Sequence, residues 1–364
     1  MKRTKKIILY VFLLGCTVIV ISEAASKLFA NCQLSGIIYD KQLGWRLKKK
    51  YGWPLNGMDS TRTERKINFN RRGFRDRDHS LVKDEGSKRI MFLGDSYTAG
   101  LEYSNSEIFT SLFDKMLNAN ATDKINYEIM NISVPAWATD QQYKYLKEEG
   151  MSYDPDYIFL MIAPNDIRET YGKQFFYLRN GNLEEKSIPT IPWKARVYWL
   201  LANYSCAFQS LQTKFKSQYG SFSNIFEYFP ISFPVGDKLC SDRNLFTKEV
   251  PDEILAAREL FKTILLTINQ ICKNSHCKLL LAIIPTKIEY DGSLKEDKYQ
   301  PGKIAEYIKV IAEENDIPFL DLGFYLRAEE DDPLKIFISQ EYHLNNYGHA
   351  FVARKLLPFF NSNQ

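Results

Sequence analysis

The sequence predicts an α/β fold built around a parallel β-sheet, and two observations support that prediction. After Lys88, short runs rich in β-forming residues alternate with amphipathic stretches, which is typical of βαβ units. Four of the five runs are followed by a loop and then by a helical pattern. The predicted strands cover residues 89–93, 127–134, 157–162, 278–284 and 318–322.

The clearest predicted helix covers residues 252–272. Leu260, Ile264 and Ile268 recur there at a spacing of four, which places them on one face of a helix. Asp252, directly after a proline, supplies a start signal. The sequence therefore predicts a long amphipathic helix just before the fourth strand.

The pattern divides the chain into three parts with one insertion. Residues 1–25 hold a basic tip and an apolar run, residues 26–86 indicate an extended segment with short strands, and residues 87–364 carry the alternation. Between about 168 and 250 the alternation gives way to an aromatic-rich region. This insertion is either a second packing layer or a lid over a site. We expect packing with some contribution to a pocket, because large aromatic side chains are more often core than ligand contacts.

Composition favours a globular enzyme. With 364 residues, 45% of them hydrophobic, the chain can bury one large core or two modest ones. Lys and Arg number 48 against 44 Asp and Glu, a net charge of +4, which is too balanced for the basic surface of a nucleic-acid binder. We therefore expect no nucleic-acid partner.

The first residues predict a membrane-targeting element. Four basic residues lie within residues 2–6 and precede an uncharged apolar run at residues 7–22. We expect an uncleaved transmembrane helix; a cleaved signal peptide and lipidation at Cys16 are the alternatives. Because the basic cluster lies before the run, the positive-inside rule predicts that the chain after about residue 25 is extracytoplasmic. The expected product is a single-pass membrane protein whose main domain lies on the periplasmic or cell-surface side.

Five cysteines follow the apolar run, so one stays unpaired within a monomer. Cys272 and Cys277 bracket a short loop between a predicted helix and a predicted strand, which makes a local disulfide one hypothesis. A zinc site that adds His276 lacks a fourth ligand and the usual spacing, so we expect no metal.

Ser96 is the first candidate for chemistry. It follows Gly94 and Asp95 at the end of the first predicted strand, and a helical pattern comes next. Open α/β folds place their sites at this carboxyl edge, where backbone N–H groups can point at the space next to an exposed hydroxyl. Asn165 follows the third strand at the same edge, and His343 follows the fifth. A neutral imidazole there can take the proton from Ser96.

These motifs, in this order, resemble the SGNH (GDSL-like) hydrolase superfamily. Its members carry Gly-Asp-Ser, a glycine after the second strand, an Asn-Asp pair and a carboxyl-terminal histidine. The resemblance implies a flavodoxin-like three-layer α/β/α sandwich with a five-stranded parallel sheet. It also implies Ser96 as nucleophile, His343 as base, and an oxyanion hole made by the Ser96 N–H, the Ala136 N–H and the Asn165 side chain. Further segments similar to a bacterial subgroup with an amino-terminal anchor read YDKQLGWRLKKK, INFNRRGFRD, TDQQY and HLNNYGHAFVA.

The sequence departs from the family pattern at three places. Ala136 stands where a glycine is usual, so its backbone must avoid strained φ values. Ala163 replaces the glycine before the Asn-Asp pair. The family's acid usually lies two or three residues before the histidine, where this chain has Gln340 and Glu341. We assign Glu341 as the acid; a Ser-His dyad whose imidazole contacts a backbone carbonyl is the alternative.

Three polar residues near these motifs are expected to have structural roles. We expect Asp95 and Asp166 to support their turns, and His349 to cap a helix or to pack.

The expected function is serine-dependent hydrolysis of carboxylic esters through an acyl-enzyme on Ser96. The resemblance and the expected location imply acyl or acetyl esters of envelope carbohydrate or lipid as substrates. Two alternatives stay open: an envelope O-acyltransferase, and a degenerate, non-catalytic domain that binds a glycan or a protein. No cofactor is expected for any of them.

Overall fold

The computed structural model describes most of the chain as two compact units. One unit comprises residues 1–48 and 189–232, and the other comprises residues 49–188 and 233–364. The parallel sheet lies in the second unit. The structure does not describe residues 1, 30–35, 51, 55–65, 120–124, 187–192, 212–241, 340 and 341.

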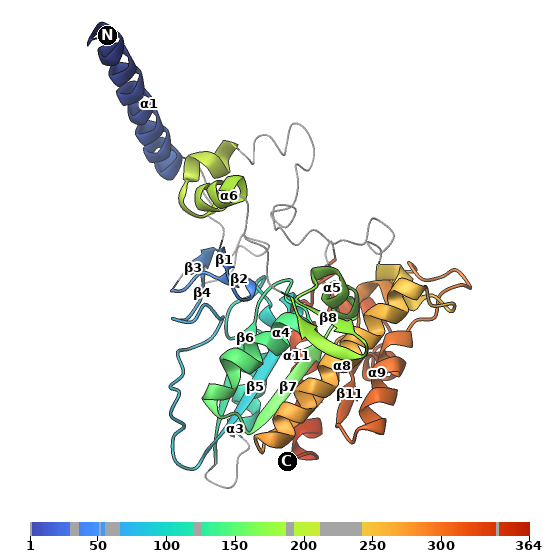
Figure 1. Cartoon of the computed structure of the whole chain (residues 1–364). Coiled ribbons are helices and arrows are strands. Elements are labelled where there is room, and N and C mark those ends of the chain that lie inside the picture. Colours follow the sequence, from blue (N-terminus) through green and yellow to red (C-terminus); the bar gives the residue numbers. More distant parts are fainter. Residues whose placement is uncertain are drawn as a thin grey trace. The chain divides into compact units, whose positions relative to one another are not determined.

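A five-stranded parallel sheet forms the centre of the second unit, as the sequence predicted (Figure 1). The strand order is β11-β10-β7-β5-β6, and every neighbouring pair is parallel. Both faces are covered, which explains why the strands are almost continuously apolar. The strands are β5 (Ser87–Gly94), β6 (Asn126–Ser133), β7 (Tyr157–Ile162), β10 (Lys278–Ile283) and β11 (Phe319–Asp321).

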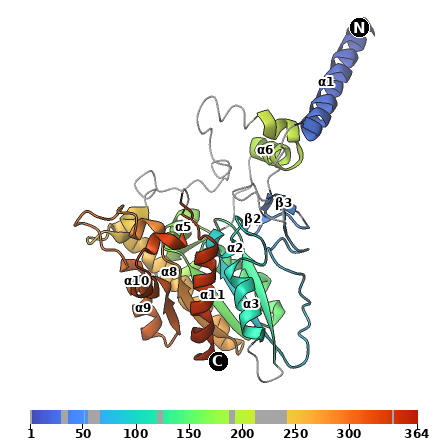
Figure 2. The same cartoon turned by 180° about the vertical axis from the view of Figure 1, so that it is seen from behind.

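Helices cover the two faces of this sheet. α3 (Phe109–Ala119) and α11 (Asn346–Asn361) pack together on one face (Figure 2). α4 (Thr139–Glu148) and α8 (Asp252–Asn274) pack on the other (Figure 1). α8 is the helix predicted at 252–272, and the three layers agree with the predicted sandwich. The other helices of this unit are α2 (Ser96–Ala99), α5 (Asn165–Lys173), α9 (Lys303–Glu314) and α10 (Leu322–Glu329).

An aromatic core fills the space between the sheet and the layer of α3 and α11. Phe92 of β5 stacks on Phe159 of β7, with ring centroids 4.8 Å apart. Phe113 of α3 meets Phe360 of α11 edge to face at 5.8 Å. All four side chains are fully buried, so this layer fixes the strands that lead to the carboxyl edge.

The insertion expected at about 168–250 divides between the two units. Beyond α5 it forms a hairpin of β8 (Phe176–Arg179) and β9 (Asn182–Glu185), which contacts α8. α6 (Trp193–Tyr204) belongs to the first unit, whereas the 3₁₀ helix Asp242–Phe246 belongs to the second. Part of the insertion is therefore a packing layer against α8.

The first unit joins the amino terminus to the region around α6. Glu23 of α1 (Lys2–Phe29) accepts hydrogen bonds from the N–H groups of Cys206 and Ala207 at 3.0 and 3.2 Å. These bonds, led by the one from Cys206, lower the pKa of Glu23 to about 2. Cys206 itself forms a disulfide bond. The first unit also contains a small antiparallel pair, β1 (Ile37–Asp40) with β2 (Gly44–Leu47), whereas a second such pair, β3 (Gly52–Pro54) with β4 (Lys66–Asn68), belongs to the second unit.

The predicted transmembrane helix is not supported. The amino-terminal run does form a helix, α1, of 28 residues. Among the residues that the structure describes, however, no helix is long and apolar enough to cross a membrane. The uncharged stretch at residues 7–22 spans only about 24 Å of helix, against a hydrocarbon core of about 30 Å, and charged Lys6 and Glu23 flank it.

Cys272 and Cys277 do not form the local disulfide that their spacing suggested. Both thiols are free and buried. The N–H of Cys277 donates to the carbonyl of Cys272 at 2.9 Å, which closes the turn between α8 and β10. The Cys272 thiol, followed by burial, raises the pKa of the Cys277 thiol, so Cys277 is a poor nucleophile in this state.

His349 packs in the core, as expected. It lies in the first turns of α11 and is 1% exposed. Its ring lies between Phe109 and Tyr103, with centroids 5.9 and 5.6 Å away. Nδ1 accepts a hydrogen bond from the N–H of Phe109 at 3.3 Å. Burial, and after it the charge of Arg75, lowers the pKa of His349 to about 3 from its ordinary 6.5.

His349 is therefore expected to make the fold sensitive to acid. Below pH 6.5 the unfolded chain binds a proton on this residue that the folded chain does not bind, so stability is lost as pH falls from about 6.5 towards 3. We predict that His349→Gln removes about 2 kcal/mol of the stability difference between pH 7.5 and pH 5. Urea unfolding of both proteins at the two pH values measures this. Equal losses in both proteins would contradict the assignment.

Candidate active site

Ser96 lies on the tight turn between β5, an inner strand of the sheet, and α2. Asp95 caps this turn, and its Oδ1 accepts from the N–H of Tyr97 at 2.9 Å. Gly94 is required here for lack of space, because a Cβ would lie 2.2 Å from Oγ1 of Thr98. The turn therefore presents Ser96, half-buried, at the carboxyl edge of the sheet.

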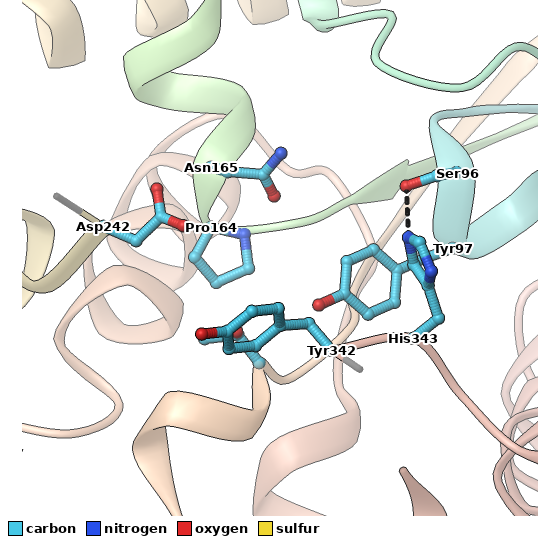
Figure 3. A pocket seen from close by; sticks show the side chains of 8 residues that line it. Ser96, Tyr97, Pro164, Asn165, Asp242, Tyr342 and His343 are labelled. Atoms are coloured by element: carbon cyan, nitrogen blue, oxygen red, sulfur yellow. Dashed lines mark hydrogen bonds between the residues drawn. The ribbon is translucent and has the colours of Figure 1, made fainter. Parts of the chain in front are cut away.

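His343 lies against the hydroxyl of Ser96. Its Nε2 is 2.9 Å from Oγ of Ser96, although the two residues are 247 positions apart (Figure 3). The loop that carries His343 is held by a hydrogen bond from the Ile338 N–H to its carbonyl at 2.9 Å. The ring of Tyr97 meets the imidazole edge to face at 5.3 Å. The structure thus brings together the two residues that the sequence proposed as nucleophile and base.

Glu102 supplies a carboxylate on the other side of the imidazole. Its Oε1 lies 3.0 Å from Nδ1 of His343, an ion-pair distance. This residue was not predicted from the sequence, because the acid was sought next to the histidine. Glu341, which was assigned instead, lies outside the described residues. The sequence contained one signal that could have identified Glu102: it is an acidic residue six positions after Ser96, in the loop that follows the nucleophile turn.

Arg75 holds the loop that carries Glu102. Its guanidinium, 2% exposed, donates to the carbonyls of Ala99, Gly100 and Tyr103, with the first bond at 2.8 Å. These carbonyls flank Glu102 on both sides in the chain. Because a guanidinium is planar and its donors are fixed in direction, three such bonds define the course of the loop. No role was predicted from the sequence for the segment NRRGFRD in which Arg75 stands.

Asn165 begins α5 directly after β7. Its Nδ2 donates to Oε1 of Glu169, one turn later, at 2.9 Å. Lys173, one further turn along α5, contacts Oε2 of Glu169 at 2.6 Å and also donates to the backbone carbonyl of Ala136. The structure therefore links Asn165 and Ala136, the two expected oxyanion donors besides Ser96, through one ion pair.

Ala136 lies in the left-handed region of backbone space, with φ of 61°. A glycine is usual in the family at this place, and the structure gives the physical reason: a side chain costs energy at positive φ. The expectation that the backbone here avoids strained φ values is therefore wrong.

Buried carboxyls support the two turns next to Ser96 and Asn165. Burial raises the pKa of Asp95 to about 6. Asp166 accepts from the Ala163 N–H at 2.9 Å, and burial, followed by the charge of Asp95, raises its pKa well above the usual range. Glu169 behaves differently: burial favours its neutral form, but Lys173 and Arg168 outweigh that effect and lower its pKa. Of these three carboxyls, Glu169 is therefore the one whose pKa lies below its ordinary value.

Ser96 and His343 open onto a small cavity of about 160 Å³ (Figure 3). Asn165 faces it from the opposite side. One of its other walls, Asp242, comes from the insertion, which was expected to contribute to a pocket, although no residue of it was named from the sequence. The lining residues are Ser96, Tyr97, Pro164, Asn165, Asp242, Thr286, Tyr342 and His343.

Several solved structures are similar to this chain. The acetyl xylan esterase AlAXEase is 18% identical, with 74% of this chain and 98% of that chain covered and a TM-score of 0.40. TesA is 12% identical, with 76% and 99% covered and a TM-score of 0.43. The acetylxylan esterase Axe2 from Geobacillus stearothermophilus is 14% identical, with 75% and 93% covered and a TM-score of 0.42. No curated protein matches the sequence.

One family matches most of the chain. Residues 92–351 match the GDSL-like Lipase/Acylhydrolase family, a span that begins in β5 and ends in α11. The matched span includes Ser96, Glu102, Asn165 and His343. The chain therefore belongs to the GDSL-like lipase/acylhydrolase family and is a hydrolase that acts on ester bonds.

Proposed function

We propose that this protein is a serine esterase in which Ser96 forms an acyl-enzyme. The observation that supports this most strongly is the 2.9 Å contact between His343 Nε2 and Ser96 Oγ. In the proposed reaction, His343 takes the hydroxyl proton while Oγ attacks the ester carbonyl, and it then gives that proton to the leaving alcohol. Water attacks the acyl-enzyme in the same way and releases the acid, so the enzyme returns unchanged.

Glu102 is the proposed acid of the triad. Its carboxylate lies 3.0 Å from Nδ1 of His343, where a negative charge stabilises the imidazolium that forms in both steps. Glu341, the acid expected from the sequence, lies just before His343 in the chain and outside the described residues. The dyad alternative, with a backbone carbonyl as the only support of the ring, does not account for the position of Glu102.

The proposed oxyanion hole uses the N–H groups of Ser96 and Ala136 and the amide of Asn165. Ser96 and Asn165 line one cavity. The ion pair of Glu169 and Lys173, which does not line that cavity, contacts both Asn165 and Ala136. Fixed donors of this kind stabilise the charge that develops on the carbonyl oxygen, because they need no reorientation during the reaction.

The cavity supports a short acyl group, with acetyl as the proposed one. Its volume of about 160 Å³ is roughly half of the smallest pockets that hold drug-sized ligands, about 300 Å³. Asp242, Thr286 and Tyr342 place polar groups around it, which suits an alcohol rich in hydroxyl groups. We therefore propose acetyl or short acyl esters of carbohydrate as substrates. An acyltransferase that passes the acyl group to a sugar hydroxyl is the second candidate, because the same geometry serves water or an alcohol.

We also propose that the catalytic residues work outside the cytoplasm. A basic cluster precedes the apolar run at residues 7–22, which supports outward transfer of the chain beyond that run. Cys206 forms a disulfide, a bond that persists in oxidising compartments. The hydrogen bonds from Cys206 and Ala207 to Glu23 support a helix α1 that stays part of the mature protein, rather than a cleaved signal peptide.

The esterase proposal is tested with p-nitrophenyl esters of increasing acyl length. We expect hydrolysis of the acetyl ester, and a kcat/KM lower by at least about tenfold for the octanoyl ester, because the longer chain does not fit the cavity. Ser96→Ala is the matched control and should show none of this activity. Hydrolysis no faster than in Ser96→Ala would overturn the esterase proposal. Acetyl transfer to an oligosaccharide that outpaces release to water would favour the acyltransferase.

The acid is tested by two matched substitutions near His343. Glu102→Gln should lower kcat by about a hundredfold to ten-thousandfold, since it removes the charge that stabilises the imidazolium. Glu341→Gln should change kcat much less. Steady-state kinetics on proteins of unchanged melting temperature measure both. A large loss of kcat in Glu341→Gln, together with a small loss in Glu102→Gln, would identify Glu341 as the acid instead.

The location is tested by a reporter that is active only outside the cytoplasm, fused after Gln364. We expect activity, because the basic cluster lies before the apolar run. Mass spectrometry of the mature protein should also find an amino terminus that lies before Glu23. A reporter that works only in the cytoplasm would refute the orientation, and an amino terminus after Glu23 would refute the retained helix.

A further inference from the structure

The two candidate oxyanion donors besides Ser96 come from different strands. Ala136 follows β6 and Asn165 follows β7, and these strands lie on either side of β5, which carries Ser96. Both donors nevertheless contact one ion pair on α5, formed by Glu169 and Lys173. A single pair of side chains thus spans the turns on both sides of the nucleophile.

Glu169 determines which end of the Asn165 amide binds it. Oε1 of Glu169 accepts from Nδ2 of Asn165 at 2.9 Å. A carboxylate only accepts hydrogen bonds, so it binds the amide nitrogen and excludes the amide oxygen. That nitrogen carries two hydrogens, and one remains for an oxyanion in the cavity that Asn165 lines (Figure 3).

Lys173 fixes the backbone of Ala136. Its Nζ donates to the Ala136 carbonyl, and Ala136 has a φ of 61°. An alanine at this positive φ is less stable than an alanine in an ordinary backbone conformation. The ammonium group opposes a flip of the peptide between Ala136 and Trp137, to which this carbonyl belongs. The Ala136 N–H lies in the preceding peptide, so Lys173 acts on its direction through the φ and ψ angles of Ala136.

The ion pair holds the side chains of Glu169 and Lys173 in fixed positions. Lys173 and Glu169 are four residues apart on α5, and Nζ lies 2.6 Å from Oε2. The Lys173 side chain is 4% exposed and that of Glu169 is 15% exposed. A buried charge is costly unless it is paired and hydrogen-bonded, so neither side chain is free to leave the other.

We propose that Glu169 and Lys173 are positioning residues that set the oxyanion hole, Glu169 through Asn165 and Lys173 through Ala136. The proposal rests on the serine esterase function proposed above. Neither residue lines the cavity described for the substrate. Their effect therefore acts on turnover more than on substrate binding.

The first test uses single substitutions in the full-length protein. Glu169→Gln keeps the shape of the side chain but can present an amide nitrogen to Asn165, and Lys173→Met removes the charge. Each should lower kcat by roughly tenfold or more, with KM changed less than about threefold. The reason is that a misplaced oxyanion donor loses part of the transition-state stabilisation that a deleted donor loses completely. Lys309→Met, in the exposed pair of Lys309 and Glu313 on α9, is the matched control and should leave kcat unchanged.

Double mutants separate positioning from a general structural role. In an Asn165→Ala background, Glu169→Gln should cost less than about twofold, because its target is gone, whereas Lys173→Met should keep most of its effect. Ala136→Gly should restore part of the activity of Lys173→Met, since glycine adopts positive φ without the lysine. Melting temperatures are measured for every variant. If Lys173→Met does not fold, the result for Glu169→Gln decides whether the proposal holds.

The outcomes separate this inference from the function on which it rests. The rate at which a fluorophosphonate labels Ser96 is measured beside ester hydrolysis. If the native protein is neither labelled nor active, the serine esterase proposal fails and this inference fails with it. If the native protein is active but the losses from Glu169→Gln and Asn165→Ala multiply independently, the esterase proposal stands and the positioning role is overturned.

Discussion

The parallel pairing of β5 with β6 and β7 is the constraint on which the site depends. Gly94 pairs with Ser133, and Leu93 pairs with Leu160, so the three strands end side by side. The chain then turns at each end, and these three turns carry Ser96, Ala136 and Asn165. A residue that is remote in sequence becomes a neighbour of the nucleophile simply because its strand ends at the same edge. The aromatic layer under α3 and α11 keeps that edge in register.

Two buried basic side chains turn this edge into a defined site. Arg75 binds the backbone carbonyls around Glu102, and Lys173 binds the backbone carbonyl of Ala136. Both cations act on the main chain rather than on the substrate. Burying such groups is costly unless their donors are satisfied, so the loops that satisfy them have little freedom to move. The imidazole of His343 is thus held between the hydroxyl on one turn and the carboxylate on the next loop.

Sequence patterns predicted what depends on local periodicity and on motif order. All five strands begin and end within two residues of the predicted limits, and Ser96, His343 and Asn165 meet at one cavity. The patterns could not predict contacts made by single side chains across the fold. Glu102 was missed because the acid was sought beside His343. Arg75 was missed because the partners that fix the Glu102 loop are backbone carbonyls, which every residue carries and which no sequence pattern distinguishes. The transmembrane helix was expected from apolar character, but no helix in the described part of the chain qualifies as a membrane span.

The most direct measurement of the proposed catalytic site is a crystal structure of the protein with a phosphonate bound covalently at the active site. We predict a bond between phosphorus and Oγ of Ser96, with the phosphonyl oxygen within hydrogen-bond distance of Asn165 Nδ2 and of the Ala136 N–H. Glu102 should remain beside Nδ1 of His343. A phosphonyl oxygen that points away from both donors, or a different carboxylate at Nδ1, would contradict the proposed mechanism.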